Sequence, residues 1–387
     1  MTNKEKKEAR LRKALSHQEP DRVPVGESFW TGFRERCNEK WGEGFDPYRH
    51  FDLDYIIITP NMDPHIKPFE IIEEKGDDIV VKTGFEATIR RSGKIPMPHF
   101  EAFSMKQQED MDLFEFDDPA DPRRFYAGGD DQINCVGDAL ARNIPSWDER
   151  VDAYVDDFPV FGSVCEVYEF LWRIIGTENS FYWVLDKPEY IERFINRCGD
   201  FLYAFCEAQI IAGRGRLSGM YIWGDIAYVN GMLFSPDMWR RLFKPHVKRL
   251  IDLCHAHGLM VIYHGCGDAR LVYEDFIEIG LDGYNPLEAK AGLDLVALKK
   301  EYGGRLGFCG NMNVQLWETN DRKVIEAEVT RLLRGAPGGG WIFQSDHSVS
   351  SGVSPESYEY AVALIRKYGN YPIDLARLEE AERTGIY

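Results

Sequence analysis

The sequence lacks the features that direct a protein to membranes or nucleic acids. It has no run of about 18 apolar residues, so no segment is suited to span a bilayer. Residues 1–25 are charged and lack the apolar core of a signal peptide. Basic side chains are in deficit, because 46 Lys and Arg stand against 64 Asp and Glu, and the net charge is −18. This field repels phosphate backbones and anionic lipids, so we expect a cytoplasmic protein that binds neither nucleic acid nor membranes.

The sequence also lacks the cysteine pattern of an exported, disulfide-linked protein. Its eight cysteines are scattered over 387 residues, and disulfides are rare in the reducing cytosol. We therefore expect free thiols, most of them buried as small apolar side chains. The cysteines are Cys37, Cys135, Cys165, Cys198, Cys206, Cys254, Cys266 and Cys309. Cys266 and Cys309 differ from the rest because each lies at the end of a predicted strand.

The sequence does contain a repeated alternation of short apolar strands and amphipathic helices. Apolar residues make up 44% of the chain and aromatic residues 13%, which is enough for a large core. Eight strand candidates are bounded by glycine, proline or charge, at residues 23–27, 55–59, 159–164, 220–225, 260–264, 283–285, 306–309 and 341–344. Helical patterns cover residues 188–213, 235–258, 294–302, 321–335 and 354–368.

Eight strands separated by helices predict an α/β fold, a (β/α)8 TIM barrel formed by residues 1–387 as a single domain. An insertion over residues 60–157 separates the second strand from the third. Inside it, residues 79–92 alternate with period two and predict a β-hairpin. We expect the insertion to form a cap or an oligomer surface, with a separate domain as the alternative.

The predicted strand ends carry an unusual concentration of chemically active side chains. In a parallel barrel, functional residues collect at the carboxyl ends of the strands. Here those ends carry Glu27, Asn61, Glu166, Asp225, His264, Cys266, Glu288, Cys309, Asn311, Asp346 and His347. Acids are also common caps of helix N-termini, so capping is the alternative for each acid taken singly.

His264 and Cys266, in the stretch "VIYHGCGD", form the sharpest pair. Two residues separated by Gly265 can face one point when the chain turns between them. Imidazole and thiolate are preferred ligands of zinc, so the pair predicts a metal site. The alternative is a core histidine beside a buried thiol. Candidates for the third ligand are Cys309, Glu288 and His347. Cys309 is equally compatible with packing under the barrel floor.

His347 follows Asp346 directly, at the end of the eighth predicted strand. A histidine held by a neighbouring carboxylate is a common general acid. This pair is therefore an alternative to a role of His347 as a metal ligand.

The segment from Tyr221 to about Tyr368 resembles the uroporphyrinogen decarboxylase superfamily. The resemblance is carried by "YIWGDIAYVNGMLFSPDMWRRLFKPH", "HAHGLMVIYHGCGDA", "IEIGLDGYNPLEAKAGLDLVALKKEYGGRLGFCGNMN" and "IFQSDHSVSSGVSPESY". It implies a (β/α)8 barrel with its active cleft at the strand C-termini. Uroporphyrinogen decarboxylases carry an arginine-rich "MRQAGR"-type segment after the first strand. This chain instead has "VGESFWTGFRER", where Glu27 is poorly suited to a polyanionic tetrapyrrole.

The other arm of the superfamily comprises corrinoid-dependent methyltransferases, such as methylcobalamin:coenzyme M methyltransferase and the methyltransferase components of O-demethylase systems. Members of this arm bind zinc through a His-x-Cys motif and a later cysteine. His264 and Cys266 match the motif, while Ser345, Asp346 and His347 stand where the later cysteine is expected. The resemblance implies zinc-assisted transfer of a methyl group between a small substrate and a corrinoid protein, and it is compatible with a homodimer.

We assign the candidate residues three roles. Predicted metal ligands are His264, Cys266 and Cys309. Predicted catalytic residues, which supply protons or orient groups, are Asp225, Glu288, Asp346 and His347. Predicted substrate contacts are Glu27, Glu166, Trp223, Tyr263 and Asn311, and the aromatic members suit a methoxylated aromatic substrate.

No Asp-x-His-x-x-Gly signature of a corrinoid-binding domain occurs in the chain, so the corrinoid is expected on a partner protein that docks over a broad cleft. The alternatives are a decarboxylase-like lyase that needs no metal, a metal-dependent hydrolase and a non-catalytic binding relative. The identity of the methyl donor stays open.

Overall fold

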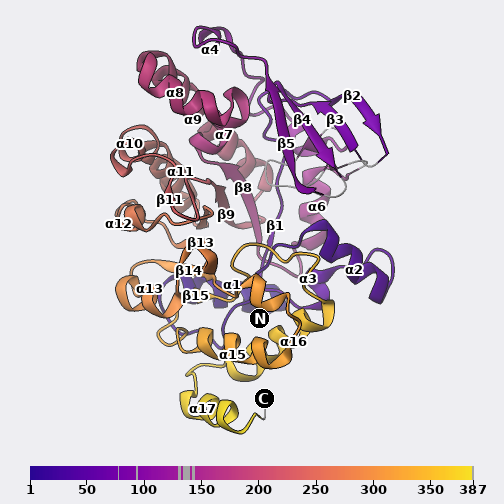
Figure 1. The fold of residues 1–387 in the computed structure, drawn as a ribbon, viewed down its shortest axis with the longest axis vertical. Helices are drawn as coiled ribbons and strands as arrows, with labels where there is room; N and C mark the ends of the chain where they lie inside the picture. The colour runs from indigo at the N-terminus through magenta and orange to yellow at the C-terminus, as the bar shows by residue number, and fades with distance from the viewer. Residues whose placement is uncertain (77, 93–94, 130–131, 134–139, 142–143, 386–387) are drawn as a thin grey trace.

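A curled parallel sheet lies at the centre of the computed structural model (Figure 1). The structure describes residues 1–76, 78–92, 95–129, 132–133, 140–141 and 144–385. Seven strands follow one another in the order β1-β8-β9-β12-β13-β14-β15, and all pairs are parallel. They are β1 (Ile56–Ile57), β8 (Val160–Cys165), β9 (Leu217–Trp223), β12 (Met260–His264), β13 (Gly283–Leu287), β14 (Gly307–Gly310) and β15 (Trp341–Ile342). This α/β fold is consistent with the predicted barrel.

The segment predicted as the first strand, residues 23–27, connects the two edges of this sheet. Val25 forms a parallel bridge with Phe343, just after β15, and its carbonyl accepts the N–H of Asp54, just before β1, at 2.8 Å. The Asp54 carboxylate in turn accepts the N–H of Val25 at 2.7 Å. Two guanidinium groups, from Arg10 and Arg22, pair with this buried carboxylate. Their charge compensates for the burial of Asp54 where the sheet closes.

Helices surround the sheet and connect its strands (Figure 1). Those that follow β8 are α7 (Val167–Ile175), α8 (Thr177–Asp186), α9 (Pro188–Gly213), α10 (Pro236–Leu242), α11 (Lys244–Ala256), α12 (Tyr273–Glu278), α13 (Leu295–Tyr302), α14 (Val314–Trp317), α15 (Arg322–Leu333), α16 (Pro355–Tyr368) and α17 (Leu375–Thr384). Before them lie α1 (Asn3–Leu15), α2 (Thr31–Trp41) and α3 (Pro47–His50). Among the described residues, no helix is both long and apolar enough to cross a bilayer.

Capping residues set where the predicted helices begin. Asp294, Asp321 and Ser354 each accept a hydrogen bond from a first-turn amide, so α13, α15 and α16 begin one residue later. The helix predicted over 235–258 is instead divided at Phe243 into α10 and α11. Pro245 explains the division, because it has no N–H to continue the hydrogen bonds of α10.

The chain between β1 and β8 forms a second, antiparallel sheet at one side of the barrel (Figure 1). Its strands are β2 (Glu70–Lys75), β3 (Asp78–Lys82), β4 (Ala87–Ser92) and β5 (Ile95–Phe103), and β3 and β4 pair within the segment predicted as a hairpin. Short elements follow: α4 (Asp110–Leu113), α5 (Arg123–Tyr126), β6 (Gln132–Ile133), β7 (Leu140–Ala141) and α6 (Trp147–Tyr154). Cys135 lies outside the described residues.

Arg124 anchors this region near the end of β1. Its buried side chain donates hydrogen bonds to the carbonyls of Asn61 at 3.1 Å and Asp63 at 2.8 Å. The same guanidinium lies over the ring of Phe201 on α9, 5.1 Å from the ring centre. One buried cation therefore links the chain after β1 to a barrel helix.

Candidate metal centre

Five side chains with metal-binding groups converge at the carboxyl ends of β9, β12, β13 and β15. The ligand atoms of Asp225, His264 and Cys266 lie within 4.8 Å of one another, and so do those of Cys266, Glu288 and His347. Cys266 belongs to both groups and therefore lies between them. We refer to these five residues as the donor cluster.

The turn after β12 places His264 and Cys266 on the same side. The Nε2 atom of His264 lies 3.5 Å from the Cys266 Sγ atom and 3.8 Å from Asp225 Oδ1. The same Asp225 oxygen accepts the backbone N–H of Cys266 at 2.8 Å, which holds the turn in place. A Cβ atom at Gly265 would come within 2.7 Å of the Tyr284 hydroxyl and 2.8 Å of the Gly224 carbonyl. Only glycine fits there, so the spacing of the motif follows from tertiary packing as well as from the turn.

The second half of the donor cluster is more deeply buried. Glu288 is only 3% exposed, and its Oε1 atom lies 4.0 Å from His347 Nε2 and 3.5 Å from Lys290 Nζ. The ring of Trp30 packs edge-on against His347, with 5.6 Å between ring centres. Burial, with His264 and Lys290 nearby, lowers the pKa of His347 to about 4. His347 is therefore neutral at physiological pH and has a lone pair for a cation or a proton.

The thiol of Cys266 is buried beside negatively charged side chains. Burial raises the pKa of this thiol well above its usual value, and the neighbouring carboxylates of Asp225 and Glu288 raise it further. A divalent cation would reverse this effect, because it stabilises a thiolate and balances both carboxylates. Two imidazoles, one thiol and two carboxylates are the donor types that zinc prefers. The residues present thus fit a zinc ion.

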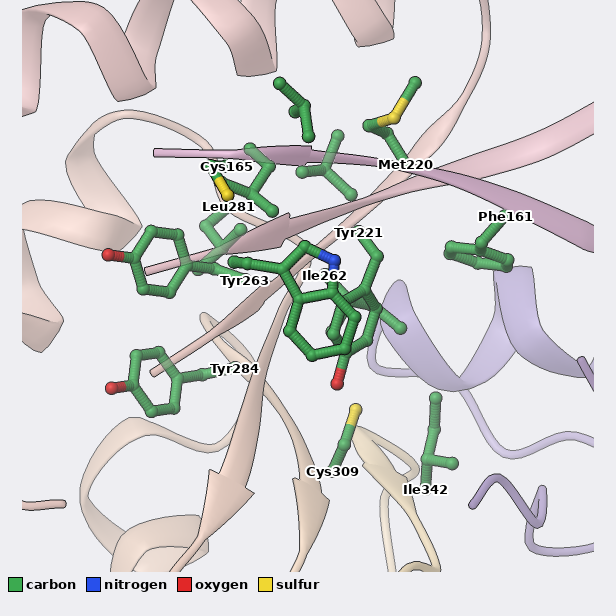
Figure 2. Packing of buried hydrophobic residues seen from close by; sticks show 14 of the residues in the cluster. Phe161, Cys165, Met220, Tyr221, Ile262, Tyr263, Leu281, Tyr284, Cys309 and Ile342 are labelled. Atoms are coloured by element: carbon green, nitrogen blue, oxygen red, sulfur yellow. The ribbon is translucent and has the colours of Figure 1, made fainter. Parts of the chain in front are cut away.

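Cys309, the predicted third ligand, does not join the donor cluster. It is fully buried on β14, and a Cβ atom at Gly283 would lie 3.8 Å from its Sγ atom. Figure 2 shows it among packed side chains that include Tyr221 and Ile342. The structure therefore replaces the ligand expectation with a packing role, because β14 directs the thiol into the core.

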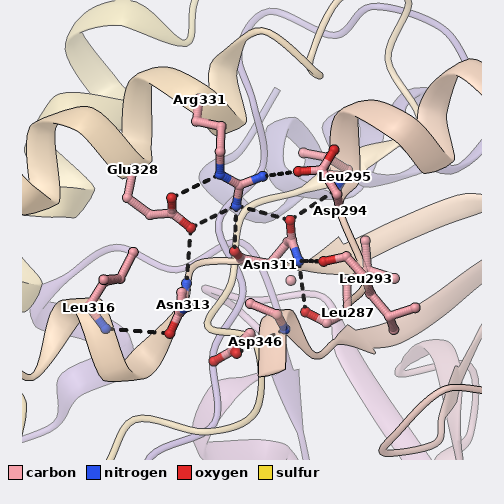
Figure 3. A network of polar contacts seen from close by, with 12 residues as sticks. Leu287, Leu293, Asp294, Leu295, Asn311, Asn313, Leu316, Glu328, Arg331 and Asp346 are labelled. Carbon is pink, nitrogen blue, oxygen red and sulfur yellow. Dashed lines mark hydrogen bonds and ion pairs between the residues drawn. The ribbon is translucent and has the colours of Figure 1, made fainter. Parts of the chain in front are cut away.

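Asn311 was predicted to contact substrate, but its side chain is fully buried and all its hydrogen-bonding groups are used within the protein (Figure 3). Its amide N–H groups donate to the carbonyls of Leu287 and Leu293, and its oxygen accepts from the Leu295 N–H and from Arg331. The residue holds together the loops that follow β13 and β14. This geometry gives Asn311 a structural role.

Asp346 likewise holds two loops together. Its carboxylate oxygens accept the backbone N–H groups of Val314 at 2.8 Å and Ala289 at 3.1 Å. Burial raises the pKa of Asp346 to about 6, although both amides favour the charged form. Both oxygens thus hold the loops beside His347 and Glu288 in place, while a role of Asp346 in proton transfer stays a prediction.

Glu27 is also occupied by protein groups. Its carboxylate accepts hydrogen bonds from the Ser345 N–H at 3.0 Å, the Ser345 hydroxyl at 2.7 Å and the Ser28 N–H at 2.9 Å. Burial raises the pKa of Glu27 to about 8. These contacts fix the chain that leads to His347 and engage both carboxyl oxygens of Glu27, while its contact with substrate stays a prediction.

The three other predicted substrate contacts, Trp223, Tyr263 and Glu166, differ in whether they contact the donor cluster. The Trp223 ring packs against His264, with 4.8 Å between ring centres. The Tyr263 hydroxyl donates to the Gly224 carbonyl at 2.9 Å, and the side chain is fully buried against Phe276. Glu166 is fully buried, and burial raises the pKa of its carboxyl to about 8. Of these three, Trp223 is the one that borders the donor cluster.

Sequence reasoning missed Asn285, Lys290 and Trp30. Asn285 pairs in register with His264 across β12 and β13, and its Oδ1 atom lies 2.7 Å from His264 Nδ1. The available signal was its position, since an amide at the end of the predicted strand 283–285 neighbours the end of strand 260–264. Trp30 and Lys290 carried no such signal, because Trp30 precedes α2 and Lys290 lies in a single 3-10 turn, Ala289–Ala291, and the placement of both segments depends on the fold.

Comparisons with known proteins agree with this architecture. Residues 149–368, more than half of the chain, match the family described as Uroporphyrinogen decarboxylase (URO-D). Uroporphyrinogen decarboxylase from Myxococcus xanthus is 23% identical over 195 residues, which cover 48% of this chain and 50% of that protein. The protein of the same name from Thermus thermophilus is 29% identical over 182 residues, covering 45% and 48%. The chain thus spans about half the length of the curated relatives it matches.

The fold is similar to that of a methyltransferase from Methanosarcina mazei, with a TM-score of 0.62, 16% sequence identity, and coverage of 93% of this chain and 98% of that one. At this identity the likeness concerns the fold alone. Together, the parallel sheet, the cluster at its carboxyl ends and the sequence match show that the chain belongs to the uroporphyrinogen decarboxylase family.

Proposed function

We propose that this protein is a zinc-dependent methyltransferase that moves a methyl group between a small substrate and a corrinoid carried by a partner protein. The observation that carries the proposal is the convergence of two imidazoles, a thiol and two carboxylates at one end of the sheet. A lyase that acts without a metal does not need a thiol that lies between two sets of possible metal ligands. The structural likeness to a methyltransferase from Methanosarcina mazei points in the same direction for the fold.

We assign zinc binding to the donor cluster, in which Cys266 belongs to both groups of possible ligands, with Asp225 and His264 in one group and Glu288 and His347 in the other. A bound zinc ion would supply a Lewis acid for the heteroatom that carries or receives the methyl group. Asp225 has a half-exposed side chain, so it can meet and orient a substrate that arrives from solvent. The rings of Trp223 and Trp30 pack against His264 and His347 and place apolar surface next to the donor cluster.

The charge of the site favours uncharged methyl donors. Asp225, Glu288 and a Cys266 thiolate together carry three negative charges, while zinc brings two positive charges and Lys290 lies at the edge. With zinc and Lys290 included these charges sum to zero, so the site has no net positive charge to attract a polyanionic substrate. Methanol, a thioether and a methoxylated aromatic are uncharged and fit this condition, while a methylamine is a cation at neutral pH and meets no repulsion from the carboxylates. The methoxylated aromatic also suits the two indole rings.

Metal analysis of two cysteine variants tests the proposal. The wild-type protein should bind about one zinc ion per chain, and Cys266→Ala should lose most of it. Cys309→Ala is the matched control, because it removes a buried thiol that lies outside the donor cluster, and it should keep the zinc. Equal loss in both variants, or a wild-type protein that binds no zinc, contradicts the metal assignment.

The transfer itself is tested with free cob(I)alamin as the methyl acceptor. Wild-type protein with the correct methyl donor should produce methylcob(III)alamin, followed by its absorption spectrum, and Cys266→Ala should not. The second candidate is a decarboxylase-like lyase, favoured by the names of the relatives from Myxococcus xanthus and Thermus thermophilus. It predicts release of CO2 by metal-free protein, without any corrinoid.

A further inference from the structure

A chain of buried polar side chains crosses the interior of the sheet and ends on His264. The Tyr55 hydroxyl donates to Gln344 Oε1 at 3.2 Å, and Asn285 Nδ2 donates to the same oxygen at 3.1 Å. On its other side, Asn285 Oδ1 lies 2.7 Å from His264 Nδ1 and accepts the Tyr221 hydroxyl. Asn285 is fully buried and Gln344 is 1% exposed. The four residues that lead to His264 come from different segments: Tyr221 from β9, Asn285 from β13, Tyr55 from just before β1 and Gln344 from just after β15.

The two faces of the Asn285 amide have different partners. Its nitrogen is used by Gln344, so its oxygen is the atom that faces His264. Rotation of the amide would break the bonds to Gln344 and Tyr221 together, and a buried polar group without a partner is costly. The oxygen toward His264 is therefore held in place, and it can only accept a hydrogen bond.

The Tyr221 hydroxyl also lies 3.3 Å from His264 Nδ1, but it donates its proton to Asn285 Oδ1, so the acceptor on Asn285 determines which nitrogen of His264 carries the proton. A neutral imidazole has one N–H and one lone pair. If Nδ1 donates to Asn285, Nε2 keeps the lone pair. Nε2 is the atom that lies 3.5 Å from Cys266 Sγ and 3.8 Å from Asp225 Oδ1. Metal-binding histidines commonly have the second nitrogen fixed by such a hydrogen bond.

We propose that Asn285, held by Gln344, is a positioning residue that keeps the proton of His264 on Nδ1, so that Nε2 faces Cys266 as a ready metal ligand before any ion binds. The inference rests on the proposed function for its biological purpose. The tautomer itself is a property of the metal-free chain, and it can be measured without any methyl transfer.

The direct test is nitrogen NMR of the full-length, metal-free protein labelled with 15N in its histidines. The spectrum is recorded at about pH 9, where an ordinary imidazole is neutral. The His264 signals are assigned by their absence in His264→Gln. We expect Nδ1 to carry the proton and Nε2 to be unprotonated. A wild-type spectrum with the proton on Nε2 overturns the inference, and it needs no Asn285 variant to do so.

Two substitutions separate positioning from simple packing. Asn285→Asp loses the hydrogen bond to Gln344 Oε1 but keeps an acceptor beside His264, so it should retain the Nδ1–H form and bind zinc within a few-fold of the wild type. Asn285→Leu removes the acceptor, so the Nε2–H form should appear and zinc affinity should fall by about 10- to 100-fold. Zinc affinity is measured by competition with a chelator. An unchanged tautomer and affinity in Asn285→Leu contradicts the inference.

Gln209→Leu is the matched control for the loss of a buried amide. Gln209 is also fully buried and exchanges hydrogen bonds with the backbone of Ser163, both at 2.9 Å, from helix α9. The variant should lose stability while keeping the His264 tautomer and zinc affinity. If it lowers zinc affinity as much as Asn285→Leu, a general loss of packing explains both effects and the inference fails. If methyl transfer is not found but the tautomer and affinity results hold, the proposed function fails and the inference stands.

Discussion

Two polar regions at the same end of the sheet differ in how their charges are balanced. In the donor cluster, Asp225, Glu288 and the Cys266 thiol converge, and Lys290 is the nearby cation at 3.5 Å from Glu288. In a second region, which we name the Arg331 network, the Arg331 guanidinium bonds to Glu328, Asp294 and Asn311 (Figure 3).

Both regions use residue types that sequence patterns cannot tell apart, namely acids and amides at strand ends. In the Arg331 network the protein itself supplies the cation, at 2.7 Å from Glu328 and 2.5 Å from Asp294. In the donor cluster, by contrast, the side chains that lie closest together are all potential ligands of a metal ion. A structural polar cluster therefore differs from one suited to a ligand less in its residue types than in how many of its polar groups are paired with other groups of the protein.

The largest effect should come from Arg331→Met, which removes the central cation of the Arg331 network. Glu328 is 6% exposed and would remain as a buried acid without this partner. We expect a loss of about 2 to 3 kcal/mol in the free energy of unfolding, measured with urea, because breaking a buried pair leaves an uncompensated charge. Zinc content should not change. Loss of zinc in this variant would remove the proposed distinction between the two regions.

Glu288→Gln tests the same distinction from the other side. We expect zinc affinity to fall at least about tenfold, because a carboxylate ligand is replaced by a neutral amide. The free energy of unfolding of the metal-free variant should be equal to that of the wild type or higher, since the substitution removes a buried negative charge that repels the Asp346 carboxylate. Chelator competition and urea unfolding measure the two quantities. A destabilised variant with unchanged zinc affinity contradicts the assignment of Glu288.

Glu166→Gln sharpens the comparison with an acid that belongs to neither region. Burial raises the pKa of Glu166 from 4.5 to about 8, so between these values the folded chain holds a proton that the unfolded chain has lost. The stability from this group is complete below the unfolded pKa and is lost as pH rises through the folded pKa. Wild-type stability should therefore fall relative to Glu166→Gln, by up to about 1.4 kcal/mol per pH unit.

The measurement for Glu166 is the difference in urea unfolding between the two proteins at about pH 5, 6.5 and 8, because other acids contribute equally to both. A difference that does not vary with pH contradicts the prediction. Zinc content should be unchanged, since Glu166 lies outside the donor cluster.

The smallest effect is expected for Lys290→Met. Removing this cation, 3.5 Å from Glu288, should tighten zinc binding by up to about fivefold, because exposed charge pairs contribute at most about 1 kcal/mol. Lys300→Met on α13 is the control, since its exposed side chain lies outside the donor cluster, and its zinc affinity should equal that of the wild type. Weaker binding in Lys290→Met would show that Lys290 supports the site rather than competing with the ion.

Much of the fold was predictable because its signals are local. Apolar runs bounded by glycine or charge marked β12 and β8 to within a residue or two, and caps such as Ser354 marked helix starts. The prediction of a strand at 23–27 was less accurate, because Val25 forms an isolated bridge with Phe343 and hydrogen bonds with Asp54 rather than part of a regular strand. A capped start at Ser235 was also correct, but Pro245 divided the helix that follows.

Local sequence pattern was enough to predict the alternation of strands and helices, the barrel-like architecture and the closeness of His264 to Cys266. All of these depend on short-range pattern and on a single turn. Which side chains from distant parts of the sequence lie next to His264 and Cys266 depends on the tertiary structure. It placed Glu288 and His347 beside Cys266, Asn285 against His264, and Cys309 in the core. The reason is geometric: the meeting of loops from different strands depends on sheet register and packing, and neither is recorded within any one stretch of the chain.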